Sequence, residues 1–183
     1  MDIEVKIGEV AVTKDANNLT ASGVGSCLVI AFYDPNLKIG ALAHAMLARR
    51  ETKDMRQRTN DMKQRTKDNR YPLPSGEREK AHRAFSGEGV PQDTKYIDAA
   101  IDEMLKKMLQ QGAKRENLEA KLIGGANMFS AFASDIGKQN VLSAKEKLKK
   151  EGIKLVGESV GGSQGRSVEF SAASGIVTVK MKF

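Results

Sequence analysis

The chain has 183 residues, which is about the length of one domain. Apolar residues make up 40% and charged residues 29%, a composition that favours a soluble globular protein and excludes the disordered and fibrous classes. Lys and Arg number 30 against 23 Asp and Glu, and the formal net charge of +7 suits a polyanion only if it gathers on one face. The single cysteine, Cys27, excludes an intramolecular disulfide and therefore the disulfide-rich secreted class.

The N-terminal region reads as strands. Residues 1–7 alternate charged and apolar side chains, which predicts a strand, and they lack the basic and apolar segments of a signal peptide. Two short apolar runs, residues 27–33 and 39–47, flank an Asp-Pro-Asn turn signal and predict a hairpin. The apolar runs are well short of the roughly 18 residues that span a bilayer. We therefore expect a cytoplasmic protein that is not inserted in a membrane.

Residues 49–93 differ from the rest of the chain. Residues 54–60 (DMRQRTN) are followed by a near repeat at 61–67 (DMKQRTK), and residues 49–70 carry nine basic and four acidic side chains. Residues 71–91 are rich in Pro and Gly, which indicates a loop. We predict one domain over residues 1–183 that carries a basic insertion at about 49–93. The insertion would be a solvated helix or mobile arm, then a loop.

That basic stretch also raises the alternative of nucleic-acid binding. We do not expect nucleic acid as a partner, because Asp54, Asp61 and Asp68 interrupt the positive charge and residues 49–70 contain no aromatic side chain for base stacking. The repeat is also a poor coiled coil, since each seven residues contain one Met.

Regular structure returns after residue 93. A helix is predicted with Asp93 or Thr94 as its cap and Gly112 as its end, because five apolar side chains fall on one face. These are Ile97, Ile101, Met104, Leu105 and Met108. A short strand at 121–123 follows. A second helix, capped by Ser134 or Asp135, extends to about residue 150.

Three further strands are predicted at residues 153–160, 166–171 and 175–183. Strands thus cluster at both ends of the chain with helices between them. The fold class is α+β, a layered α/β sandwich of mixed strands flanked by helices.

The sharpest local feature is the glycine-rich turn before Cys27. Backbone amides in such a turn form a nest for an anion, so Gly25 and Ser26 are candidates for binding an oxyanion. A hairpin centred between residues 35 and 36 pairs Cys27 directly with His44, which puts their Cβ atoms about 4.5 to 5.5 Å apart on one face. A slip of one residue would separate them onto opposite faces.

A simpler interpretation is that Cys27 and His44 are ordinary buried residues, since free cysteine usually behaves as a small hydrophobe. The combination of one cysteine, a glycine-rich turn and a histidine on the same face favours chemistry instead. One cysteine and two separated histidines form no usual ligand cluster, so we expect no metal and no cofactor. The glycine pairs at 124–125 and 161–162 match neither a phosphate loop nor a dinucleotide fingerprint.

The sequence resembles the CheD family of chemoreceptor glutamine deamidases at several ordered blocks. The blocks are residues 23–27 (GVGSC), 34–35 (DP), 40–47 (GALAHAML), 95–101 (KYIDAAI), 121–129 (KLIGGANMF), 136–141 (IGKQNV) and 161–166 (GGSQGR). Together they span nearly the whole chain except residues 49–93. The resemblance implies the sandwich fold and a site built from Cys, His and Thr.

By position, the resemblance makes Cys27 the nucleophile and His44 the base. The family's Thr stands six residues before the cysteine, where this chain has Ala21, so Thr20 or Ser22 is the candidate for the third catalytic role. Arg166 is a candidate for binding a substrate carboxylate, or else caps a surface.

The implied activity is deamidation of glutamine side chains on the cytoplasmic domains of methyl-accepting chemoreceptors, with glutamate and ammonia as products. A cysteine suits this reaction because a poor electrophile benefits from an acyl intermediate. The alternative is a weakly catalytic or non-catalytic binding partner that regulates a CheC-type phosphatase.

Overall fold

The computed structural model describes residues 2–14, 17–49, 93–127 and 136–181. The chain divides into two compact units, one made of residues 1–49 and 91–183 and the other of residues 50–90. Apart from its two ends, the predicted basic insertion lies outside the described residues, and so do the predicted caps Ser134 and Asp135.

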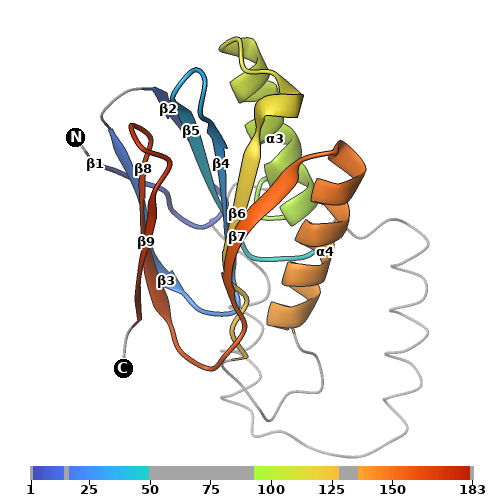
Figure 1. The fold of residues 1–183 in the computed structure, drawn as a ribbon. Coiled ribbons are helices and arrows are strands. Elements are labelled where there is room, and N and C mark those ends of the chain that lie inside the picture. The colour runs from blue at the N-terminus through green and yellow to red at the C-terminus, as the bar shows by residue number, and fades with distance from the viewer. Residues whose placement is uncertain (1, 15–16, 50–92, 128–135, 182–183) are drawn as a thin grey trace, which may run out of the picture. The chain divides into compact units, whose positions relative to one another are not determined.

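The first unit consists of two sheets and a layer of helices (Figure 1). The four-stranded sheet has the order β1 (Asp2–Glu4), β3 (Asn18–Val24), β8 (Arg166–Ser171) and β9 (Val177–Met181). The five-stranded sheet has the order β2 (Val10–Lys14), β5 (Ile39–Ala45), β4 (Leu28–Asp34), β6 (Glu119–Gly124) and β7 (Lys154–Val160). The helices are α3 (Ile97–Gln110), the short 3-10 helix η1 (Arg115–Asn117) and α4 (Ile136–Glu151).

Parallel and antiparallel pairs occur in both sheets. β1 pairs with β3 and β6 with β7 in parallel, and all the other neighbouring strands are antiparallel. The predicted α+β layered sandwich of mixed strands is confirmed. A layer of this kind needs strands that are apolar on both faces where the sheet is covered twice.

Strand β4 meets that requirement and organises the core. Leu28, Ile30 and Phe32 pack toward α3 and α4, whereas Val29 and Ala31 pack toward the four-stranded sheet. The middle sheet is therefore buried on both faces, and its central strand reads as a continuous apolar run.

The predicted β4–β5 hairpin is present, but its predicted register is wrong by two residues. Val29 lies opposite His44 and Asp34 opposite Ile39. The turn is centred one residue later than predicted, and the Asp34 side chain stabilises it by accepting hydrogen bonds from the amides of residues 36 and 37, at 2.9 and 3.2 Å. Lys38 then takes a left-handed conformation with φ of 52°. A shift of two residues preserves the face, so His44 and Cys27 are diagonal neighbours.

The strand predicted at residues 1–7 is shorter than expected, since only β1 forms there, and the next strand, β2, belongs to the other sheet. The chain crosses from β1 to β2 at a turn where Gly8 has φ of 80°. Gly8 and Glu9 bond to the backbone of His44, since the amide of Gly8 donates to the His44 carbonyl at 2.7 Å and the His44 amide donates to Glu9 at 3.2 Å. Strand β3 was not predicted, because residues 18–24 mix polar, small and apolar side chains.

Helix α3 has the predicted apolar face, and Gly112 follows its end with φ of 90°. The predicted cap is wrong: Tyr96 is the N-cap residue and makes no side-chain capping bond. The two ends of the 49–93 segment meet near this point. Leu47 forms a β-bridge with Tyr96, and the amide of Ile97 donates to the Leu47 carbonyl at 2.9 Å. The chain therefore leaves and re-enters the sandwich at adjacent positions.

Ion pairs join the helical layer. Glu151 at the end of α4 pairs with Arg115 of η1 and with Lys147, which also reaches Asp102 of α3 at 2.5 Å. The Lys147 and Arg115 bonds hold the pKa of Glu151 below its ordinary value of 4.5, although partial burial opposes them.

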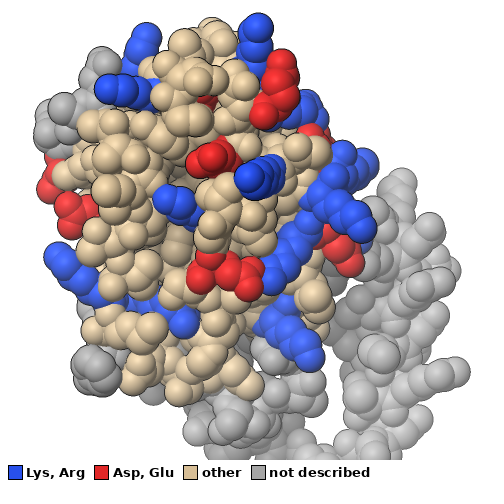
Figure 2. Space-filling model, viewed as in Figure 1, with Lys and Arg blue, Asp and Glu red and all other residues tan. Residues whose placement is uncertain are grey.

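On the face seen in Figure 2, basic and acidic side chains are interspersed rather than segregated. Among the described residues, no helix has the length and apolar character that a transmembrane span requires.

Candidate active site

The turn that carries Cys27 connects β3 to β4 and is held by its carbonyl groups. The carbonyl of Gly25 accepts from the amide of Ala126 at 2.9 Å, and that of Cys27 accepts from Gly125 at 2.7 Å. The carbonyl of Ser26 accepts from the Asn140 side chain at 2.9 Å. Within the residues that the structure describes, the amides of Gly25, Ser26 and Cys27 donate no backbone hydrogen bond. The turn thus fixes its carbonyls and leaves its amides available to an anion.

Gly124, the last residue of β6, allows this strand to approach the turn that carries Cys27. It has φ of 116°, and a Cβ atom added there would lie 2.3 Å from the carbonyl oxygen of Cys27. That distance is shorter than any real contact, so a side chain at this position would push the turn away. Gly124 therefore has a packing role, because it lets β6 lie against the turn that carries Cys27.

Cys27 is 9% exposed, and burial raises the pKa of its thiol from 9.0 to about 11, while its own backbone amide opposes the shift. The residue therefore rests as a neutral thiol at pH 7. A nucleophile in this state needs a base that accepts its proton during attack.

His44 has the properties of such a base. It is 1% exposed in β5, and burial lowers its pKa below the ordinary 6.5, with a backbone group of Val5 acting in the opposite direction. Neither ring nitrogen makes a well-formed hydrogen bond to a described residue. The imidazole is thus neutral at pH 7 and has a free acceptor nitrogen.

The strand register relates the two side chains. Because the bond from Gly125 extends the β4–β6 ladder to Cys27, the cysteine takes the same side of the sheet as Val29, directly across from His44. The strand register therefore places Cys27 and His44 on one face of the sheet, as diagonal neighbours rather than directly opposite one another as predicted.

Residue 21, where the family resemblance implies a catalytic Thr, is Ala in this chain and has no hydroxyl. Ala21 of β3 is buried in the layer between the two sheets. Thr20 and Ser22 alternate with it and face outward; Ser22 is exposed and donates to Glu4 at 3.2 Å. The structure does not bring either candidate hydroxyl to the cysteine and the histidine.

Arg166, at the start of β8, is buried and bonds to glycines at the ends of two neighbouring strands. Its guanidinium donates to the carbonyls of Gly124 at 3.3 Å and Gly161 at 2.7 Å. These bonds tie the ends of β6 and β7 to the four-stranded sheet, and Gly161 in turn donates to Gly124 at 2.9 Å.

Asn140 is a site residue to which the sequence analysis assigned no role. It is fully buried on α4, and its side-chain nitrogen donates to the carbonyls of Ser26 and Met46, each at 2.9 Å. The sequence feature that could have pointed to Asn140 is its spacing: it lies four residues before Ala144 and eight before Leu148, which puts an amide on the buried face of the helix.

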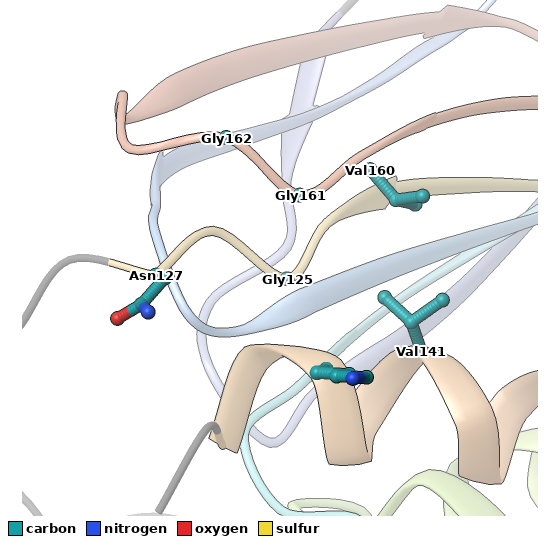
Figure 3. Close-up of a pocket in the computed structure, with 7 residues that line it drawn as sticks. Gly125, Asn127, Val141, Val160, Gly161 and Gly162 are labelled. Carbon is teal, nitrogen blue, oxygen red and sulfur yellow. The ribbon is translucent and has the colours of Figure 1, made fainter. Parts of the chain in front are cut away.

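A cavity of about 290 Å³ lies beside the turn (Figure 3). Val141 of α4 and Val160 of β7 point into it from opposite sides. Gly125 both lines the cavity and bonds to Cys27, so the cavity adjoins the cysteine turn. The remaining lining residues are Asn127, Lys138, Gly161 and Gly162.

The part of the chain that the structure describes contains no group of three or more His, Cys, Asp or Glu side chains that could bind a metal ion. A thiol, a neutral imidazole and backbone amides are groups that acyl-transfer enzymes use.

Known proteins resemble this chain over nearly its full length. A family profile described as CheD chemotactic sensory transduction matches residues 79–181, a range that begins after Cys27 and His44. A protein of Thermococcus kodakarensis named "Probable chemoreceptor glutamine deamidase CheD" is 33% identical over 183 residues, covering 98% of this chain and 92% of that protein. The "Chemoreceptor glutamine deamidase CheD" of Thermotoga maritima is 34% identical over 176 residues, covering 96% and 89%. A Geobacter metallireducens relative, "Probable chemoreceptor glutamine deamidase CheD 2", is 36% identical over 182 residues, covering 97% and 92%. This chain belongs to the CheD family.

Proposed function

We propose that this protein deamidates glutamine side chains of chemoreceptors, with Cys27 as the nucleophile and His44 as the base. The observation that carries the proposal is a buried thiol and a buried, neutral imidazole on one face of adjacent strands, in a chain of the CheD family. The relatives' names supply the substrate class. The protein would act in the cytoplasm, on the cytoplasmic domains of the receptors.

The reaction runs in two halves. The Cys27 sulfur attacks the side-chain amide carbon of glutamine as its proton passes to His44, and the tetrahedral intermediate expels ammonia, which takes that proton. A thioester remains on the enzyme. Water, deprotonated by His44, attacks the thioester, and the proton returns to the departing thiol. The products are ammonia and a glutamate side chain, which adds one negative charge to the receptor.

The resting protonation states support this sequence. The raised pKa of Cys27 and the lowered pKa of His44 both favour the neutral pair over the thiolate and imidazolium pair. Proton transfer therefore accompanies attack rather than preceding it. The amides of Gly25, Ser26 and Cys27, which donate no backbone hydrogen bond among the described residues, are candidates for the oxyanion site, where one donor contributes about 2.7 to 4 kcal/mol in other acyl-transfer enzymes.

Arg166 fits a positioning role better than direct substrate contact, because two of its donors already bond to backbone carbonyls. The glutamine side chain would reach Cys27 by way of the cavity beside the turn, which borders Cys27 through Gly125.

Mass spectrometry of a receptor cytoplasmic fragment tests the proposal. After incubation with the wild-type protein, specific glutamines should become glutamates, and ammonia should be released in equal amount. Cys27→Ala should abolish both while retaining the wild-type circular dichroism spectrum. An unmodified fragment from the organism's own receptors, after incubation with folded wild-type protein, would exclude the enzymatic role.

The second candidate function is that of a binding partner for a CheC-type phosphatase. Ala21 at the third position and the unpartnered ring of His44 favour it, since both remove an oriented hydrogen bond from the site. This role would be supported if the wild-type and Cys27→Ala proteins changed the activity of the phosphatase equally and neither deamidated a receptor fragment.

A further inference from the structure

Asn140 joins the two segments that carry the reacting side chains. One hydrogen of its amide group points to the carbonyl of Ser26, the residue before Cys27, and the other to the carbonyl of Met46, two residues beyond His44. Both bonds are 2.9 Å long, and the side chain that makes them is 0% exposed. A single planar group thus spans the gap between the cysteine turn and the end of β5.

The two segments need such a bridge because their own pairing stops here. The β4–β5 ladder ends with Leu28 opposite Ala45, so the register would next pair Cys27 with Met46. Instead, the amides of Met46 and Leu47 both donate to the carbonyl of Lys95, at 2.9 and 3.0 Å. The strands separate at the cysteine, and α4 inserts the Asn140 amide between them.

The amide at this position has a cost as well as its two hydrogen bonds. The Oδ1 atom of Asn140 is buried without a hydrogen-bond partner among the described residues, and such an atom is a desolvation penalty. Two other positions on the buried face of α4, Ala144 and Leu148, carry no polar group. An apolar residue could fill the same space without an unpaired oxygen, but it could not hold two carbonyls at once.

We propose that Asn140 is a positioning residue that sets the approach of the Cys27 thiol to the His44 imidazole; this rests on the proposed function. Without it, the cysteine turn keeps its contacts to Gly125 and Ala126, and Leu28 stays paired with Ala45, but Ser26 loses its link to Met46 beyond the end of β5. The distance across which the proton moves is then no longer held. A displacement of about 1 Å in such a pair lowers turnover by roughly 100-fold.

Ser143 provides a matched control. It lies on the same helix, one turn further on, is also buried, and its hydroxyl donates to the carbonyl of Ala48 at 2.7 Å. Ser143→Ala therefore removes the same kind of bond from helix to backbone, beyond the end of β5, without touching the turn that carries Cys27.

Steady-state kinetics with the receptor fragment provide the first measurement. Asn140→Ala should lower kcat by about 10- to 100-fold with little change in KM, whereas Ser143→Ala should keep the wild-type kcat. Thermal melting of both variants controls for folding. If Asn140→Ala does not fold, Asn140→Ser, which retains one donor, should have a kcat below that of the wild type but by less than the 10- to 100-fold expected for Asn140→Ala. Wild-type kcat in a folded Asn140 variant overturns the proposal.

A second measurement does not depend on deamidation. Cys27 is the single cysteine of the chain, so iodoacetamide labels only this thiol. At pH 7, Asn140→Ala should slow labelling toward the rate of His44→Ala, and should change nothing further in the His44→Ala background. An equal effect in both backgrounds would mean that Asn140 acts on access or stability, and overturns the proposal.

The two measurements separate the failures. Coupled labelling without any deamidation by the wild type would reject the proposed activity and retain the positioning role. Deamidation that needs His44 but tolerates Asn140→Ala would reject the positioning role alone. Labelling that is insensitive to His44 would reject the pairing on which both depend.

Discussion

Replacing His44 with Gln should change the pH dependence of deamidation as well as its rate. The thiol of Cys27 has a pKa of about 11, two units above its ordinary 9.0, so burial makes its ionisation about 3 kcal/mol less favourable. At pH 7 the free thiolate is then roughly one molecule in 10,000. The wild-type enzyme avoids this penalty if His44 takes the proton during attack, because its lowered pKa leaves it neutral and basic at pH 7.

The wild-type rate should therefore be level above the ordinary histidine pKa of 6.5. The His44→Gln rate should instead rise about tenfold per pH unit toward the thiol pKa, as expected for specific-base catalysis through the thiolate. At pH 7 the variant should be slower by about 10²- to 10⁴-fold, the usual contribution of a positioned base.

Initial rates of ammonia release from a receptor fragment, measured between pH 6 and pH 10, provide the assay. Cys27→Ala gives the background at each pH, and circular dichroism confirms that each variant stays folded over the range. A His44→Gln profile with the same flat shape as the wild type would refute the reasoning, because the thiol would then be activated by some other group.

Three further changes test other parts of the structure. Ala21→Thr should raise kcat, because the hydroxyl of the introduced Thr would give the His44 imidazole an oriented hydrogen bond. The larger side chain should also lower the stability by about 1 to 3 kcal/mol, since Ala21 is buried. A lower Tm with unchanged kcat would contradict this. Gly124→Ala should destabilise the protein more than Gly152→Ala in urea unfolding. Both glycines have a positive φ, but only a Cβ added at Gly124 meets a backbone atom, at 2.3 Å. Equal losses of unfolding free energy would mean that the close approach at Gly124 is not needed. Glu151→Gln should lower the Tm at pH 7, because the folded-state pKa of this carboxyl is depressed and its ion pairs stabilise the protein above pH 4.5. The difference in Tm should shrink as pH falls below 4.5, and a difference that grows there would reverse the sign of the argument.

The helices and strands of the C-terminal part could be predicted because their signals are local. The apolar spacing of α3 and the alternation in β8 are properties of short segments; α3 buries its predicted apolar face, and the predicted strand at residues 166–171 is present as β8. The side of the sheet shared by Cys27 and His44 was also predictable, since strand alternation has a period of two and survives a shift by two residues.

The register of that hairpin was not predictable in the same way. It depends on where the Asp34 carboxylate bonds and on the left-handed conformation of Lys38, and several turn lengths fit the same Asp-Pro-Asn signal. Strand β3 escaped prediction for a related reason. Its inward residues, Leu19, Ala21 and Val24, are interrupted by a β-bulge that spoils the alternation.

The sequence by itself determined which reactive groups exist, one thiol and one histidine in the strand region, and which family the motifs resemble. The tertiary structure decided their states: burial between layers raises the pKa of Cys27 and lowers that of His44, and it turns Thr20 and Ser22 away from the site. It also placed Asn140, more than a hundred residues from Ser26 in sequence, between the two active segments. Local periodicity specifies elements and faces, whereas desolvation and hydrogen bonding between distant segments arise only when the layers pack.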